Sequence, residues 1–220
     1  MKNWNLYFFV SIMILLASCQ EEEREFIDPN VDNTVPRNSQ LASLMKNVVT
    51  HDGSFDDIVD RGNCFSINLP YTILLNGDEF VINDVVDYQG FLNTDVIEIS
   101  FPVTITQSDH VEKIVENNAE LEVFRGLCKT EDDDIECIDF VYPMSISTFD
   151  SNSNQLNTIE IGHDSQMFNF MSNVRDNISV SINYPINLVL HNGENVGAQH
   201  NSELLSKILD AAPECDENDG

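Results

Sequence analysis

Positively charged residues are scarce in this sequence. Its 220 residues include 10 Lys and Arg against 38 Asp and Glu, which gives a formal net charge of -28 at pH 7. Proteins that bind nucleic acid or an anionic lipid surface hold the phosphates with clustered Lys and Arg. The charge balance therefore argues against nucleic acid as a partner and permits cation binding or a basic protein partner.

Familiar catalytic motifs are also missing. The sequence contains no G-x-S-x-G, no H-E-x-x-H, no paired C-x-x-C and no Gly-rich phosphate loop. Its five histidines are isolated from one another: His51, His110, His163, His191 and His200. We predict no catalytic residue and favour a non-enzymatic role. The alternative is an enzyme whose site lies in a cleft between two halves of the chain, because catalytic groups can be distant in sequence.

No apolar run is long enough to cross a membrane, which requires about 20 residues. The longest run, Leu6 to Leu16, follows Lys2 and has the length of the apolar core of a signal peptide. It ends in Leu-Ala-Ser-Cys19, which resembles the lipobox of bacterial lipoproteins. The resemblance implies that residues 1–18 are a signal peptide and that Cys19 carries the lipid, with a diacylglyceryl group and a further acyl chain such as palmitate. The alternative is an ordinary secretory signal with an incidental cysteine.

The residues directly after Cys19 are Gln20, Glu21, Glu22 and Glu23. They resemble the acidic export signal of surface-exposed lipoproteins of Bacteroidota, which promotes transfer to the outer leaflet. The resemblance implies an outer-membrane, lipid-anchored protein at the cell surface. The alternative is that these acids only keep a tether solvated and extended.

One seven-residue template occurs four times: INLPYTI from Ile67, ISFPVTI from Ile99, FVYPMSI from Phe140 and INYPINL from Ile182. Apolar residues recur at every second position, which predicts half-buried strands. Proline cannot donate a hydrogen bond to a strand ladder. We therefore expect an edge, a bulge or a gap in pairing at each proline of the template: Pro70, Pro102, Pro143 and Pro185.

Each copy is followed by a polar turn, such as Asn76-Gly77, which predicts a hairpin and a second strand. A stretch of helical period comes next. Asn and Asp side chains accept hydrogen bonds from the free amides of a first helical turn. The predicted caps are Asn83, Asn118, Asp164 and Asn201.

The cysteines indicate that the four units form two halves, residues 64–128 and 137–215, joined by an acidic linker at 129–136. We predict disulfides that join Cys64 to Cys128 and Cys137 to Cys215, each worth about 4 kcal/mol in the chain-entropy model. The alternative pairs Cys128 with Cys137 and Cys64 with Cys215, since spacing alone does not fix connectivity.

The remaining segments are an acidic flexible stalk at 19–37, an N-terminal helical segment at 38–63 and an acidic tail at 216–220. From Ser39 onward, apolar residues at helical spacing predict a helix that packs on the first half.

Calcium is the only cofactor candidate, as a loosely bound ion, and no specific metal site is predicted. From Asp150 onward, the first oxygen-bearing positions of an EF-hand are matched, but Gln155 replaces the required glycine and Ile161 replaces the bidentate glutamate. This stretch is better interpreted as a polar hairpin turn. The acidic run Asp132, Asp133 and Asp134 is interpreted as a solvated surface.

The repeated units with bracketing cysteines are similar to those of flavobacterial lipoproteins without an assigned activity, over residues 64–215. We predict an α+β fold of two similar halves, each with two β-hairpins that form an antiparallel sheet and two short helices on one face. The predicted function is a lipid-anchored, non-enzymatic binding or spacer module for a protein or a glycan. Besides the enzyme alternative, a periplasm-facing envelope scaffold remains open.

Overall fold

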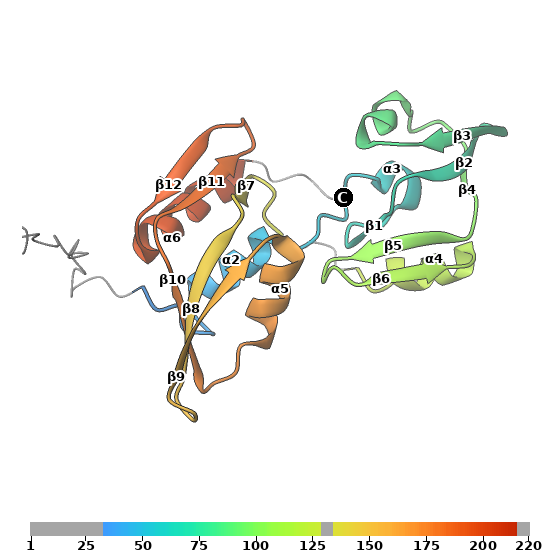
Figure 1. Ribbon diagram of the computed structural model, residues 1–220. Helices are drawn as coiled ribbons and strands as arrows, with labels where there is room; N and C mark the ends of the chain where they lie inside the picture. Colours follow the sequence, from blue (N-terminus) through green and yellow to red (C-terminus); the bar gives the residue numbers. More distant parts are fainter. Residues whose placement is uncertain (1–32, 129–133, 215–220) are drawn as a thin grey trace, which may run out of the picture. The chain divides into compact units, whose positions relative to one another are not determined.

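The computed structural model describes residues 33–128 and 134–214 (Figure 1). This part of the chain is an α+β structure with twelve strands in four three-stranded antiparallel sheets. The predicted α+β class and the two similar halves are confirmed. The predicted signal peptide, the predicted lipid attachment site Cys19 and residues 20–23 lie outside the described residues, as do Asp132, Asp133 and the tail at 216–220.

The first half contains two sheets, ordered β3-β2-β4 and β1-β5-β6. Its elements are β1 (Phe65–Ile67), β2 (Tyr71–Leu75), β3 (Asp78–Ile82), the 3-10 helix η1 (Val85–Gly90), β4 (Ile97–Ile99), β5 (Val103–Gln107), β6 (Glu112–Val115) and α4 (Asn118–Arg125). The short helix α3 (Asp57–Asp60) precedes them, in the segment at 38–63.

The second half repeats this topology, with sheets ordered β10-β8-β9 and β12-β11-β7. Its elements are β7 (Ile138–Phe140), β8 (Met144–Asp150), β9 (Gln155–Ile161), α5 (Asp164–Asn173), β10 (Ile178–Ile182), β11 (Ile186–Leu190), β12 (Asn195–Ala198), α6 (Asn201–Ala211) and the 3-10 helix η2 (Ala212–Glu214). The four predicted hairpins are present as β2-β3, β5-β6, β8-β9 and β11-β12.

The prolines explain why each half has two sheets, where the sequence predicted one. Every template proline follows a cis peptide bond and lies between two strands. The apolar run around Pro70, for example, is divided into β1 and β2, and β1 pairs with β5 while β2 pairs with β4. Each hairpin thus receives its third strand from the other unit of the same half. The expected gap in pairing is confirmed.

Side chains just after each proline form the centres of two apolar cores. Ile73, Ile105, Ile146 and Leu188 are all fully buried. Burying an aliphatic side chain of this size stabilises a fold by about 1.5–3 kcal/mol. The template therefore marks the inward-facing positions of all four sheets.

The predicted packing of helix α2 (Gln40–Val48) on the first half is wrong. Its apolar face packs in the core of the second half, against α5, α6 and β7, and not on the first half as expected. The short helix α3 belongs to the first-half core through Val59. Amphipathic spacing showed that Leu41 and Met45 are buried, but it contains no information about the partner that buries them.

The helix caps also differ from the prediction, each by one residue. The observed N-caps are Asp84, Asn117, His163 and His200. An N-cap must combine an extended backbone with a side chain that accepts from the first turn. The His163 and His200 rings do so through Nδ1, 3.3 Å from the N–H of Gln166 and Glu203, respectively.

A disulfide joins Cys64 to Cys128, as predicted, and excludes the alternative bond from Cys128 to Cys137. Cys137 is fully buried, and Cys215 lies outside the described residues, so their pairing stays a prediction. Residues 33–35 lie along β10, so the part of the predicted stalk that is described is folded. None of the helices in residues 33–128 and 134–214 is long and apolar enough to cross a membrane.

Candidate functional site

A pocket of about 730 Å³ lies along β4 in the first half, and we call it the β4 groove. All three residues of β4 line it. Because side chains of a strand alternate between its faces, three successive lining residues mean that the groove meets the edge of the strand. The complete lining is Asp57, Ile58, Val59, Arg61, Leu92, Asn93, Asp95, Ile97, Glu98, Ile99, Phe101, Asn118, Glu122 and Arg125.

No other described strand pairs with this edge, although helix α3 contacts β4. On the other side of β4, the Ser100 N–H donates to the Thr72 carbonyl at 3.0 Å and the Asn76 N–H donates to the Val96 carbonyl at 2.8 Å. Antiparallel strands alternate between bonded and non-bonded pairs, so Ile97 and Ile99 direct their N–H and C=O groups away from β2. Within the described part of the chain, these groups have no hydrogen-bond partner.

The groove carries an excess of negative charge, with four carboxylates and two guanidinium groups in its lining. Arg125 is already engaged, since its Nη1 lies 2.7 Å from Glu122 Oε1 and its Nε donates to the Asp60 carbonyl. Hydrogen bonds from Asn76 and from a backbone N–H hold the pKa of Asp95 below its usual value, so this carboxylate is ionised at neutral pH. The groove therefore favours a cationic ligand.

Exposed apolar residues are concentrated in the first half, and one of them, Leu92, lines the groove. Eleven of the fifteen large apolar side chains that are exposed among the described residues belong to the first half. Seven of the eleven fall between residues 74 and 96: Leu74, Phe80, Val81, Val85, Val86, Leu92 and Val96.

Two carboxylates are fully buried beside the groove, at Asp56 and Asp60. Asp56 Oδ2 accepts from the Ile67 N–H at 2.8 Å and Asp60 Oδ1 accepts from the Gly62 N–H at 3.0 Å. The second oxygen of each has no hydrogen-bond partner among the described residues. Burial raises the pKa of Asp56 to about 8, and burial together with the charge of Asp56 raises the pKa of Asp60.

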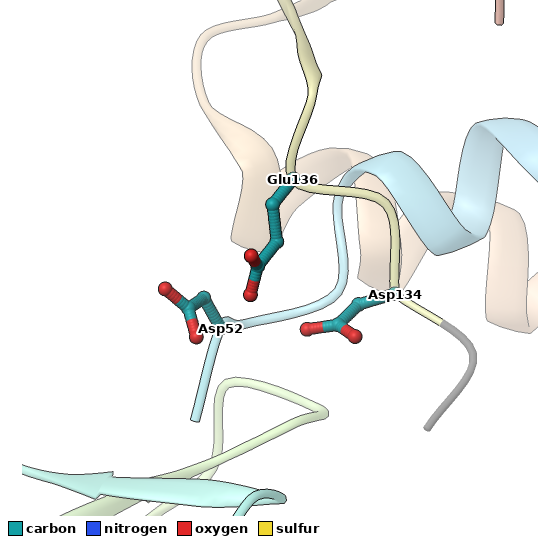
Figure 2. Close-up of side chains that lie close together, drawn as sticks. All are labelled: Asp52, Asp134 and Glu136. Carbon is teal, nitrogen blue, oxygen red and sulfur yellow. The ribbon is translucent and has the colours of Figure 1, made fainter. Parts of the chain in front are cut away.

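A second acidic cluster lies near the end of α2, where Figure 2 shows the side chains of Asp52, Asp134 and Glu136 close together. One carboxylate oxygen from each lies within 4.8 Å of the others. The Ser54 hydroxyl is within hydrogen-bond distance of Asp52 Oδ1 (2.9 Å) and of Glu136 Oε1 (3.2 Å). Three partly exposed carboxylates supply too few ligands for the six to eight oxygens that calcium takes.

A serine–histidine contact bears on the enzyme alternative. His51 Nε2 lies 2.7 Å from Ser66 Oγ. Burial and the charge of His110 lower the pKa of His51, which keeps the ring neutral. The Ser66 side chain is buried at 2% exposure, so no substrate reaches its hydroxyl without a change in the fold. This contact therefore favours a structural role.

The other calcium candidate is a hairpin turn, as predicted. Asp150 Oδ1 accepts from the Asn152 N–H and from Asn177 Nδ2, both at 2.8 Å, which ties the carboxylate to its own loop. Sequence reasoning missed the β4 groove and the buried pair Asp56 and Asp60. The spacing of four between these two acids in FDDIVD was the available signal, since it places them on one face of a helix.

No protein-family model, curated protein or solved structure matches the chain. The geometry of the β4 groove is therefore the basis for assigning a role.

Proposed function

We propose that this protein is a lipid-anchored, non-enzymatic binding module of the outer membrane, displayed at the cell surface, which binds a positively charged segment of a partner protein in the β4 groove. The observation that carries the binding role is the groove itself, with its open strand edge and its excess of carboxylates. The lipobox resemblance at Cys19 and the acids that follow it support the location.

The groove favours a protein segment over a glycan. Unpaired N–H and C=O groups along a strand edge are matched in spacing and direction by another peptide backbone. A volume of about 730 Å³ is within the range of pockets that enclose a short segment or a small ligand. Negative charge in a partly enclosed pocket also steers cationic partners during association.

The binding role is tested with two synthetic peptides, one of alternating Lys and Val and one of alternating Glu and Val, titrated onto the purified full-length protein. We expect only the Lys-Val peptide to bind, with an affinity that falls as salt is added, because salt screens exposed charges. The double variant Glu98→Gln, Glu122→Gln should bind it about tenfold more weakly. The control variant Glu160→Gln, Glu194→Gln changes the same charge on exposed positions of the second half and should bind normally.

Equal binding of both peptides, or equal losses in the groove variant and the control variant, would contradict the groove as the site. The location is tested separately by protease treatment of intact cells. The native protein should be cleaved, and a variant with Glu21, Glu22 and Glu23 replaced by Ala should be protected. Protection of both proteins would favour the periplasm-facing scaffold.

A further inference from the structure

The second half shows how an edge of this kind is filled. Residues Asn33 to Val35 lie antiparallel to β10, with Thr34 opposite Ser181. The Val35 N–H donates to the Val180 carbonyl at 2.8 Å, and the Ile182 N–H donates to the Asn33 carbonyl at 3.3 Å. The chain thus adds a short extra strand to the open edge of its own sheet.

Side chains hold this added segment in place. Val35 is inserted in the second-half core and is only 3% exposed. Asn201, the first residue of α6, donates from Nδ2 to the Thr34 carbonyl at 2.7 Å. Arg37 forms an ion pair with Asp176 at 3.0 Å, just before β10. Three side chains therefore hold the added segment in addition to its backbone hydrogen bonds: the buried Val35, the Asn201 amide and the ion-paired Arg37.

The groups that bind the added segment in the second half have counterparts at equivalent positions of the first half. Aligning Pro102 with Pro185 places Ile97 at the position of Val180 and Ile99 at that of Ile182. The backbone groups that hold the added segment on β10 are thus the groups of β4 that have no partner within the described residues. The same alignment places Asn118, the first residue of α4, at the position of Asn201, and Asn118 lines the β4 groove.

Resting on the function proposed above, we infer that the β4 groove receives an extended segment of a partner protein as an added strand, antiparallel to β4. A partner N–H donates to the Ile97 carbonyl, a partner carbonyl accepts from the Ile99 N–H, and the carbonyl between them accepts from Asn118 Nδ2. The segment carries a β-branched apolar residue at the position of Val35. Basic residues beside it face the carboxylates of the groove.

A partner of different sequence fits better than a second copy of this chain. Each copy carries a net charge of -28, so two copies repel one another. The segment at 33–35 is also already paired with β10 of its own chain. Pairing of this segment with the sheet of a second copy, in place of its own, is one outcome that the test below distinguishes.

The test uses a fluorescent peptide that copies residues 31–38 with Asp32 and Asn38 replaced by Lys, titrated onto the full-length protein. Two N-methylated versions separate strand addition from charge attraction. Methylation of the nitrogen at the Val35 position removes the donor to Ile97 and should weaken binding at least tenfold. Methylation at the Thr34 position alters an N–H that points away from the strand and should change the affinity less than threefold.

Protein variants test the same contacts from the other side. Asn118→Ala should weaken binding about five- to tenfold, since one hydrogen bond to the ligand is lost. Ile99→Pro removes the N–H on the open side of β4, a position at which an edge strand accepts proline, and should abolish binding. If Ile99→Pro does not fold, Asn118→Ala and the two methylated peptides still decide the question.

The outcomes separate this inference from the proposed function. Equal weakening by both methyl groups, in a groove that still binds the Lys-Val peptide, would overturn strand addition and leave the binding module intact. If the Lys-Val peptide does not bind either, both strand addition and the proposed binding function are overturned. A dimer that forms as the protein concentration rises, and that neither the methylated nor the unmethylated peptide dissociates, would show that two copies exchange the segment at 33–35. That result would also overturn the inference.

Discussion

Replacing Asp56 by Asn should change how the stability of the first half depends on pH. The carboxyl group is fully buried and accepts a hydrogen bond from the Ile67 N–H. Burial raises its pKa from 3.8 to about 8 in the folded protein, whereas the unfolded chain keeps the ordinary value. Between these two values the folded state retains a proton that the unfolded state has lost, so the free energy of unfolding falls as the pH rises.

For one group this slope approaches about 1.4 kcal/mol per pH unit, or about 4 kcal/mol between about pH 4 and pH 7. The stabilisation is complete below the unfolded pKa and is lost as the pH rises through the folded pKa. An amide at this position carries no charge, so Asp56→Asn should remove this part of the slope and be more stable than the native protein at neutral pH.

The assay is urea denaturation at a series of pH values, followed by circular dichroism, for the native protein, Asp56→Asn and the exposed control Glu160→Gln. The difference between the native protein and Asp56→Asn isolates this carboxyl from the other acids of the chain. A difference that stays constant with pH, or that favours the native protein as the pH rises, would contradict a raised pKa of Asp56 in the folded protein.

Three further predictions concern the core, the disulfide and the anchor. Ile73→Ala should lower the free energy of unfolding by about 2–5 kcal/mol in the same urea assay, since the side chain is fully buried, and a change under 1 kcal/mol would contradict its place in the core. Cys64→Ser should cost about 4 kcal/mol by opening the loop to Cys128, and unchanged unfolding under non-reducing conditions would show that the bond does not contribute. Cys19→Ala should move the protein from the membrane fraction to the soluble fraction, and its retention in the membrane would contradict the lipid anchor.

The sequence was most informative where structure is local. The proline template identified the strands and the interruptions in their pairing, and the polar turns identified the four hairpins. Buried positions such as Ile73 and Ile146 followed from the alternation of apolar residues. These features depend on neighbouring residues and on the geometry of a single strand, which a sequence pattern records.

Nonlocal pairing was not predictable in the same way. The alternation that marks β1 and β2 as strands does not say that β1 joins β5 and β2 joins β4, because any strand of the right period satisfies the pattern. The partner of α2 was missed for the same reason. The pairing of residues 33–35 with β10 was hidden by a composition rich in acids and prolines, which is also typical of a tether.

The candidate site was missed because it consists of backbone groups. Ile97 and Ile99 look like ordinary strand residues, and only the hydrogen bonds of β4 show that their open side is unpaired within the described residues. Asn118 was predicted as a helix cap, although its counterpart Asn201 donates a hydrogen bond to the added segment at Thr34. The repeat itself contained the clue, since both residues occupy the same place in their units.

The open edge of β4 is tested most directly by amide hydrogen exchange of the purified protein without any partner, measured residue by residue. We expect slow exchange at Ile182, whose N–H is bonded to Asn33, and fast exchange at the equivalent Ile99, whose N–H faces the β4 groove. Addition of the lysine-substituted peptide should then slow the exchange of Ile99 and leave Ile182 unchanged. An Ile99 amide that is already as protected as that of Ile182 would contradict the claim that the first half offers an open edge to a partner.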